Sequence, residues 1–233
     1  MKIITIGDLH GKDVWSTVNP DEYDKIIFIG DYVDDFHISD ALILHNLLNI
    51  LEFKKKYPDK VELLWGNHEL HYLFSYSGYG CSGYRQKMYP ALHVLLNDNK
   101  DLFVPSYSIV KDDLTYIWTH AGIHEEWYKH YFSKYVEASG IGELTIGEQF
   151  KAAFDKGVHY LFQVGHLRGG FKPMGGIFWL DKSLLRKDPL QGVRQIAGHS
   201  KVSYIETIKI NRLTRVTLVD CLDTTDKFYK LEI

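Results

Sequence analysis

The chain has 233 residues, of which 45% are hydrophobic and 24% are charged, and this composition is typical of a globular protein rather than of a disordered chain, a collagen helix or a coiled coil. With 27 Lys and Arg against 30 Asp and Glu, the formal charge of −3 gives no electrostatic reason to bind nucleic acid or an acidic membrane. No apolar run approaches the roughly 18 residues of a membrane span, so we expect no membrane-embedded segment.

Short apolar runs that stop at a Gly followed by a polar residue recur along the chain. Runs of this kind are typical of strands buried on both faces of a sheet. The predicted strands, in chain order, are residues 3–6, 25–29, 61–65, 114–118 and 195–197. The chain has no internal repeat, low-complexity tract or linker rich in Pro, Gly and Ser, so we expect a single domain over residues 1–233.

Helical patterns lie between these strands. Ser39 is a predicted N-cap, and the helix that follows it carries leucines on one face, at Leu44, Leu47, Leu48 and Leu51. Thr145 and Glu148 have the spacing of a capping box and predict a helix that runs toward Phe154. Strands that alternate with helices predict a largely parallel, layered α/β sheet.

The C-terminal part of the chain has a different pattern. Residues 203–210 and 213–221 predict an antiparallel hairpin with its turn at Asn211 and Arg212, and residues 228–233 suggest a further strand. Together with the alternating strands and helices before it, this pattern predicts a mixed α/β fold of two packed mixed sheets with helices on the outside.

Potential metal ligands follow five of the predicted strands. Ligand-binding residues gather past the carboxyl ends of strands in α/β sheets, and imidazole together with carboxylate suits Mn, Fe or Zn. A single His or Gly-Asp pair is more often a structural residue or a turn, but the pattern recurs at five strand ends. The set is too large for one ion and divides into two sites that share a carboxylate. Its members are Asp8, His10, Asp31, Asp34, Asn67, His68, His120 and His199.

Five motifs in this order resemble those of the calcineurin-like metallophosphoesterases, and within them the PPP-type serine/threonine phosphatases and the diadenosine tetraphosphate hydrolases. The motifs are Gly7-Asp8-Leu9-His10-Gly11, Gly30-Asp31-Tyr32-Val33-Asp34, Gly66-Asn67-His68-Glu69, Thr119-His120-Ala121-Gly122 and Gly198-His199. They span residues 7–199, so the resemblance covers most of the chain. It implies a four-layer α/β/β/α sandwich, in which helices flank two mixed β-sheets.

The resemblance also implies two divalent metal ions and a role for each motif residue. The implied ligands are Asp8, His10 and Asp31 for the first ion, and Asp31, Asn67, His120 and His199 for the second, with Asp31 bridging. His68 is implied to face the leaving group, with its imidazole held by Asp34.

The implied reaction is hydrolysis of a P–O bond. Two cations about 3.5–4 Å apart share a water and lower its pKa toward neutrality, so that a bridging hydroxide attacks phosphorus in line. His68, as an imidazolium, donates a proton to the departing oxygen, and Asp34 raises its basicity. The implied substrate is a phosphorylated small molecule, a nucleotide or dinucleoside polyphosphate, or a phosphoprotein.

The sequence departs from the PPP pattern at the two arginines that bind the substrate phosphate in that family, here called the phosphate clamp. Asp35 occupies the position of a phosphate-binding Arg, and the segment from Phe178 to Asp181 again ends in Asp where the family's second Arg is expected. An Asp that faced inward would repel a phosphate dianion, although Asp usually points to solvent. The departure leaves a second hypothesis open, namely a metal-binding scaffold of the same fold that does not turn over. Retention of both His68 and Asp34 argues against it.

Other residues are candidates for substrate contacts. An arginine displaced from the clamp position is one source, with Arg168 preferred over its rivals Arg85, Arg186 and Arg194, although for any one of the four a surface role is the more common one. The Tyr- and Gly-rich segment 76–84, which ends at Tyr84, suits either stacking on a nucleobase or an ordinary surface loop. His166 also follows a Gly and rivals His199 as the last ligand, but a strand precedes His199 and a hairpin follows it.

The cysteine content points to a compartment. Cys81 and Cys221 are too few for a disulfide framework or a zinc motif, which favours a reducing, cytoplasmic location, and one long-range disulfide between them stays open. The apolar start of the chain is too short for a signal peptide.

Overall fold

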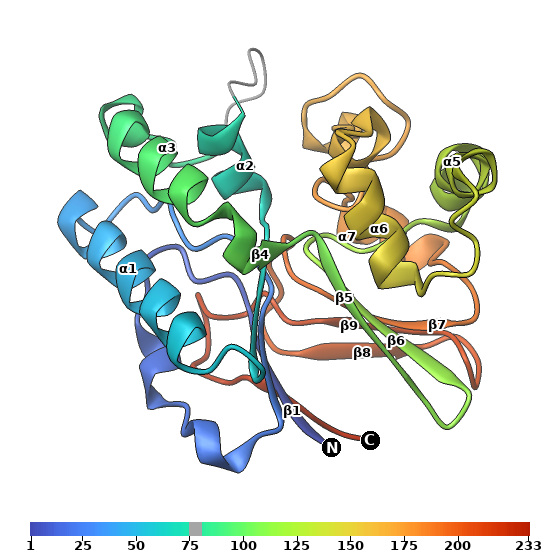
Figure 1. Ribbon diagram of the computed structural model, residues 1–233, viewed down its shortest axis with the longest axis horizontal. Helices are drawn as coiled ribbons and strands as arrows, with labels where there is room; N and C mark the ends of the chain where they lie inside the picture. Colours follow the sequence, from blue (N-terminus) through green and yellow to red (C-terminus); the bar gives the residue numbers. More distant parts are fainter. Residues whose placement is uncertain (75–80) are drawn as a thin grey trace.

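Two five-stranded mixed sheets form the centre of the protein, with helices on the outside (Figure 1). The computed structural model describes residues 1–74 and 81–233. The predicted mixed α/β class, with two mixed sheets flanked by helices, is confirmed. The described residues include no helix long and apolar enough to cross a membrane.

In the first sheet the strand order is β10-β1-β2-β3-β4. The strands β1 to β4 are parallel, whereas β10 runs antiparallel to β1 at one edge. Their bounds are β1 Lys2–Ile6, β2 Lys25–Phe28, β3 Val61–Leu64, β4 Phe103–Val104 and β10 Tyr229–Glu232.

In the second sheet the order is β5-β6-β7-β9-β8. The three central strands β6, β7 and β9 are parallel, and the two edge strands are antiparallel to their neighbours. The bounds are β5 Ser106–Lys111, β6 Leu114–Thr119, β7 Val193–Ala197, β8 Glu206–Lys209 and β9 Arg215–Leu218.

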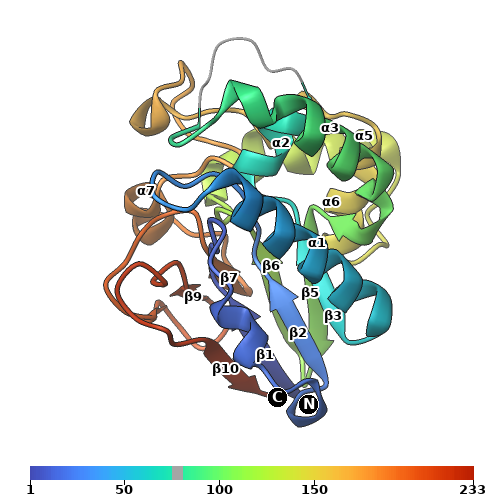
Figure 2. The same ribbon diagram turned by 90° about the vertical axis from the view of Figure 1, so that its left-hand side faces the viewer.

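The helices lie on the outer sides of the two sheets (Figures 1 and 2). On the side of the first sheet are α1 Asp40–Lys56, α2 Asn67–Leu73 and α3 Tyr89–Asp98. On the side of the second are α4 Glu125–Trp127, α5 Ser133–Ser139, α6 Ile146–Asp155 and α7 Lys182–Lys187. Short 3₁₀ helices cover Val14–Thr17, Pro20–Glu22, Gln86–Met88, Lys100–Leu102, His159–Phe162 and His166–Arg168, and a π-helix covers Tyr128–Phe132.

An apolar core lies between the two sheets. Ile27 and Leu64 of the first sheet are fully buried in one cluster with Trp118 of the second. The Trp118 indole N–H donates to Thr5 Oγ1 at 2.9 Å, so the polar atom of this buried ring is satisfied across the two sheets. This packing holds the strand ends of both sheets at one edge.

Both predicted helix starts are confirmed, but the predicted apolar face of α1 is partly wrong. The Ser39 side chain caps α1, and Thr145 with Glu148 forms a capping box at α6. Leu48 is 45% exposed, whereas Ile43 and Asn46 are buried. Buried Asn46 accepts from the Trp15 indole N–H at 2.8 Å and donates to the Lys12 carbonyl at 2.9 Å. These polar contacts fix a rotation of α1 that a purely apolar pattern does not reveal.

The predicted C-terminal hairpin exists as β8 and β9, with shorter strands than expected. The further strand suggested for residues 228–233 forms as β10, but it joins the first sheet beside β1 rather than the hairpin. The chain ends therefore lie together, and the N-terminal amine donates to the Ile233 carbonyl at 2.6 Å (Figure 1).

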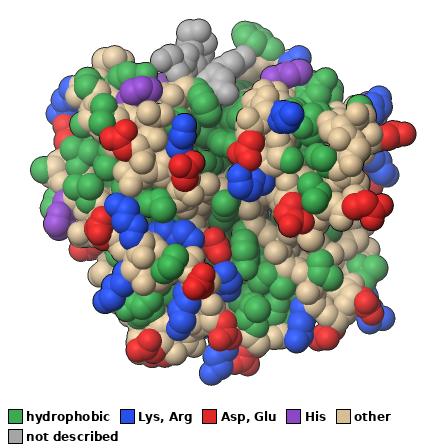
Figure 3. All heavy atoms as spheres, in the orientation of Figure 1, with side chains coloured by type: hydrophobic (Ala, Val, Ile, Leu, Met, Phe, Trp, Pro, Cys, Tyr) green, Lys and Arg blue, Asp and Glu red, His purple; other side chains and the backbone are tan. Residues whose placement is uncertain are grey.

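A groove of about 570 Å³ lies between α3 and α6, lined by apolar residues such as Trp65, Phe103 and Phe154. Figure 3 shows hydrophobic side chains along the crevice in the middle of this face, with acidic and basic side chains interspersed on both sides. No candidate metal ligand lines this groove among the described residues.

Candidate metal centre

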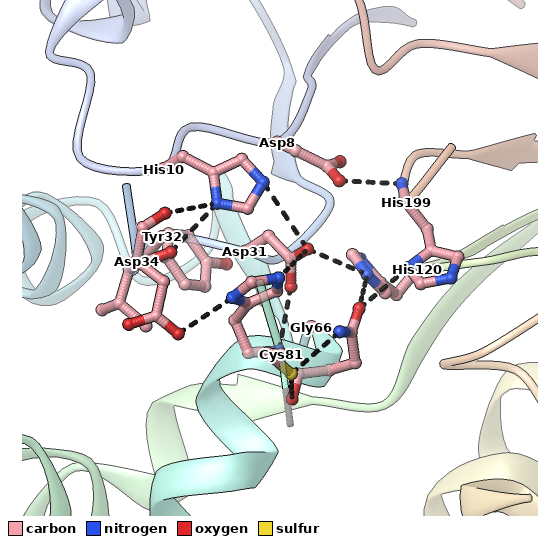
Figure 4. A network of polar contacts seen from close by, with 12 residues as sticks. Asp8, His10, Asp31, Tyr32, Asp34, Gly66, Cys81, His120 and His199 are labelled. Carbon is pink, nitrogen blue, oxygen red and sulfur yellow. Dashed lines mark hydrogen bonds and ion pairs between the residues drawn. The ribbon is translucent and has the colours of Figure 1, made fainter. Parts of the chain in front are cut away.

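The turns after β1, β2, β3, β6 and β7 meet at one edge of the sandwich and bring the predicted polar residues together (Figure 4). The network links Asp8, His10, Asp31, Asp34, Asn67, His68, His120 and His199. The strand-end residues predicted from the sequence therefore share one site.

The backbone of this site is strained. Of the six non-glycine residues with positive φ in the described part of the chain, four belong to the network: His10 at 47°, Asp31 at 53°, Asp34 at 66° and His199 at 63°. Left-handed φ is uncommon outside Gly and persists only where surrounding contacts impose it, typically at functional sites. The strained turns therefore orient these four side chains toward one another, and the strain lowers the local stability of the backbone.

Glu69 holds two of these turns together. Its buried carboxylate accepts the backbone N–H groups of Asp31 at 2.9 Å, Tyr32 at 2.8 Å, Val33 at 3.2 Å and Gly66 at 3.1 Å. Burial and the charge of Asp31 raise the pKa of Glu69 to about 7, while the imidazolium forms of His68 and His120 and the N–H donors favour the carboxylate. A Cβ at Gly66 would lie 2.2 Å from Asp31 Oδ1, so only glycine permits this approach.

Asp31 lies at the centre of three imidazoles. Its Oδ2 atom is 3.4 Å from His120 Nε2, 3.8 Å from His68 Nε2 and 3.9 Å from His10 Nε2. Burial alone would raise the pKa of Asp31, but the neighbouring imidazoles, His120 foremost, hold it well below its usual value. The carboxylate is therefore ionised and available to a cation.

Asn67 joins the two histidines on the other side of Asp31. Its Oδ1 atom lies 2.8 Å from both His120 Nε2 and His199 Nδ1. The opposite ring nitrogen of His120, Nδ1, is 2.9 Å from the Ile29 carbonyl. A histidine that donates one N–H to a backbone carbonyl keeps its other nitrogen free for a metal.

Like His120, His10 has one ring nitrogen beside backbone carbonyls and the other free for a metal. Its Nδ1 is 3.0 Å from the Val33 carbonyl and 2.8 Å from the Asp34 carbonyl, so its Nε2 faces Asp31. Asp8 Oδ2 accepts the His199 backbone N–H at 2.8 Å. Burial, the charge of Asp220 and that of Asp31 raise the pKa of Asp8 well above its usual value.

Two donor sets in this network suit divalent cations. In each set the ligand atoms lie within 4.8 Å of one another; the sets are His10, Asp31 and His68, and Asp31, His120 and His199. Buried Asp8 Oδ1 has no hydrogen-bond partner among the described residues, which is costly for a carboxylate oxygen and is relieved by a bound cation. Carboxylate, amide oxygen and imidazole thus fit the metals that the sequence predicted.

His68 forms a separate polar chain. Its Nδ1 is 2.9 Å from Asp34 Oδ2, and Asp34 Oδ1 accepts the Tyr72 hydroxyl at 2.5 Å. Burial opposes protonation of the imidazole, but the charges of Asp31 and Asp34 outweigh it and raise the pKa of His68 to about 9. The two carboxylates thus favour the imidazolium form of His68, whose Nε2 lies 3.8 Å from Asp31 Oδ2, and His68 is also a member of the first donor set.

A cavity of about 500 Å³ opens above these residues, and Arg168 lines it. Arg168 Nε lies 2.9 Å from Asp181 Oδ2, and its guanidinium also donates to Ser200 Oγ. The other three candidate arginines bind elsewhere: Arg85 to Asp40, Arg186 to Glu206 and Arg194 to Tyr116. Of the four candidates, Arg168 is the one that the structure brings to the cavity.

Asp35 and Tyr84 do not line the cavity. The Asp35 carboxylate accepts the backbone N–H groups of His37 and Ile38, so it closes its own loop. The Tyr84 hydroxyl donates to Gln86 Oε1 at 2.9 Å, and its ring packs against Tyr72. Residues 76–80 of the predicted base-stacking segment 76–84 lie outside the described residues.

Several cavity residues escaped the sequence analysis. Cys81, Trp179, Lys182, Lys201 and Asp220 also line the cavity. Asp220 was missed because the predicted strand over residues 213–221 included it, whereas β9 ends at Leu218 and leaves Asp220 beyond the strand end. His166, the rival of His199, is exposed, with Nδ1 2.9 Å from the Pro173 carbonyl.

Cys81 and Cys221 are both free thiols, so the disulfide left open by the sequence does not form.

Comparison with known proteins agrees with this geometry. The chain is similar to a candidate serine/threonine-protein phosphatase of Schizosaccharomyces pombe, 32% identical over 72 residues that make up 29% of this chain and 22% of that protein. It is also similar to a symmetrical bis(5′-nucleosyl)-tetraphosphatase of Edwardsiella ictaluri, 29% identical over 135 residues, or 54% of this chain and 46% of that protein. The matched part is thus less than half the length of either relative. The family description of calcineurin-like phosphoesterases matches residues 1–202, so the chain belongs to the calcineurin-like phosphoesterase family.

Proposed function

We propose that this protein is a two-metal phosphoesterase that hydrolyses a P–O bond. The observation that carries the proposal is the shared position of Asp31, which belongs to both donor sets, while His68, held by Asp34, lines the same cavity. A purely structural cluster has no need of a shared carboxylate between two donor sets or of an imidazole held toward it by a second carboxylate.

The proposed ligands are those that the motif resemblance implies; Asp8 is included because its buried Oδ1 has no hydrogen-bond partner among the described residues. Asp8, His10 and Asp31 would hold one ion, and Asp31, Asn67, His120 and His199 would hold the other. Mn, Fe or Zn suits these ligands. When bound, the cations supply positive charge to the phosphoryl oxygens and lower the pKa of the attacking water.

The remaining chemistry belongs to protein side chains. We assign proton donation to the leaving oxygen to His68, whose Nε2 faces the donor sets. Asp34 holds the ring by its other nitrogen, and Tyr72 holds Asp34 in turn. The Arg168 guanidinium lines the cavity and would bind a phosphoryl oxygen by a charge-assisted hydrogen bond.

The proposed substrate is a phosphorylated small molecule, a nucleotide or a phosphoprotein. The names of the two relatives, a protein phosphatase and a bis(5′-nucleosyl)-tetraphosphatase, support a phosphoprotein and a nucleotide substrate respectively. Two free cysteines also support the proposal that the protein works in a reducing, cytoplasmic compartment.

A substrate panel with added Mn²⁺ tests the proposal. We expect para-nitrophenyl phosphate, its diester, a phosphopeptide or diadenosine tetraphosphate to be hydrolysed, and the activity to disappear after chelation and return with Mn²⁺. Comparison of kcat/KM across the panel identifies the substrate class. A protein that binds two ions and turns over nothing in the panel is the scaffold alternative. The Asp181–Arg168 ion pair favours that alternative, because it occupies the proposed clamp.

The rate should fall at alkaline pH in a way that depends on Asp34. His68 must be protonated to act as an acid, so its contribution is complete below its pKa and is lost as the pH rises through it. Asp31 and Asp34 raise the pKa of His68 to about 9, and bound cations would lower it, so we expect the alkaline limb of kcat/KM below about pH 9. Removing the Asp34 charge in Asp34→Asn should move the limb down by about one pH unit. A pH–rate profile whose alkaline limb is the same in both proteins contradicts the role of Asp34.

A further inference from the structure

A thiol borders the metal centre. Cys81, labelled in Figure 4, lines the metal cavity and is 8% exposed. It lies against Asn67, the first residue of α2. The Asn67 side-chain amide Nδ2 donates to Cys81 Sγ at 3.3 Å, and Cys81 Sγ donates to the Asn67 backbone carbonyl at 3.6 Å. The thiol therefore bridges the side chain and the backbone of one proposed ligand.

The orientation of the Asn67 amide decides whether it can ligate. An amide offers an oxygen with lone pairs at one end and an NH₂ group, which is a donor only, at the other. The two ends have nearly the same size and shape, so hydrogen bonds alone choose between them. Asn67 Oδ1 faces His120 and His199, and its NH₂ group faces the sulfur.

The histidines cannot maintain this orientation in the metal-loaded protein. Their ring nitrogens nearest to Asn67 Oδ1, His120 Nε2 and His199 Nδ1, hold it only while they carry a hydrogen. As metal ligands these nitrogens present lone pairs instead. Among the described residues, Cys81 Sγ is the acceptor of Asn67 Nδ2, so it is the group left to fix the amide.

We propose that Cys81 is a positioning residue that fixes the Asn67 amide with its oxygen toward the second metal ion. This inference rests on the proposed function, because it concerns the second of the two proposed ions. Groups that orient a metal ligand typically change metal affinity about 10–100-fold when removed.

Calorimetric titration of the metal-free protein with Mn²⁺ tests the inference without an activity assay. We expect Cys81→Ala to weaken the second ion about 10–100-fold and to leave the first unchanged. Cys81→Ser keeps a group that both donates and accepts, and should stay within about threefold of the wild type. Cys221→Ala is the matched control, because Cys221 is also buried but contacts the Lys227 carbonyl away from the cavity, and it should bind both ions as the wild type does. Thermal unfolding monitored by circular dichroism verifies that each variant is folded.

A double-mutant cycle separates orientation from packing. A carboxylate has two equivalent oxygens, so in an Asn67→Asp background there is no end to select and Cys81→Ala should have no further effect on the second ion. The inference is overturned if Cys81→Ala binds the second Mn²⁺ ion as tightly as the wild type does. It is also overturned if Cys81→Ser binds that ion as weakly as Cys81→Ala, or if Cys81→Ala weakens binding by the same factor in the Asn67→Asp background as in the wild type. A wild type that binds fewer than two Mn²⁺ ions would instead contradict the proposed function.

Discussion

His68→Asn should lower kcat by about 10²–10⁴-fold while the protein keeps two metal ions. An asparagine at position 68 can still donate a hydrogen bond to Asp34, but it has no ionisable proton to give to the leaving oxygen. The loss should shrink as the leaving group becomes more acidic, because a good leaving group needs little protonation. We would therefore measure kcat for para-nitrophenyl and 2,4-dinitrophenyl phosphate, together with the metal content of each preparation.

The metal measurement matters because His68 itself belongs to one donor set with His10 and Asp31. His45→Asn is the matched control, because His45 lies on the exposed side of α1, and it should change neither rate nor metal content. An unchanged rate in His68→Asn means that His68 is not the acid. Loss of an ion together with the rate means that His68 is a ligand instead, a role the geometry also permits.

Much of the metal centre could be predicted because its residues obey a simple rule. Parallel strands that neighbour one another end at the same edge, so polar residues after β1, β2 and β3 must approach one another. The rule did not find Asp220, which also lines the cavity, because the predicted strand over residues 213–221 ran past it, whereas β9 ends at Leu218. Short runs bounded by Gly were sufficient to find these strands, since both faces of each are covered.

Other features depend on contacts that a sequence does not display. The sequence analysis missed β5, an edge strand that becomes steadily more exposed from Ser106 to Lys111 and so has no buried apolar run. It also could not assign β10 to β1, because that pairing joins opposite ends of the chain. The positive φ of His10 and Asp31 is also invisible, because it is imposed by distant anchors such as Glu69. Local propensity would have predicted Gly at such positions.

The phosphate clamp shows a third limit. Asp35 and Asp181 both occupy positions where the PPP pattern has Arg, yet they differ in structure. Asp35 closes its own loop, whereas Asp181 lines the cavity and pairs with Arg168. The sequence shows that Asp replaces Arg at both positions. It does not show that Arg168 is the side chain that brings a positive charge to the cavity, because that depends on the fold.

Asp31→Asn should remove both metal ions. Asp31 Oδ2 faces His120 on one side and His10 on the other, at 3.4 and 3.9 Å, so one charge serves both donor sets. An amide is neutral, and its NH₂ end cannot ligate a cation. Because the ions contribute several kcal/mol of transition-state stabilisation, we expect kcat/KM to fall at least about 10³-fold.

Elemental analysis after dialysis against Mn²⁺ measures the stoichiometry directly, with two ions expected in the wild type and close to none in Asp31→Asn. Asp35→Asn is the matched control for metal content, because an Asn Oδ1 can still accept from His37 and Ile38 and no donor set includes residue 35. Loss of a single ion in Asp31→Asn would contradict the bridging role. The two ions would then have independent carboxylates, and Asp8, whose Oδ1 is buried without a partner, would be the first candidate for the retained site.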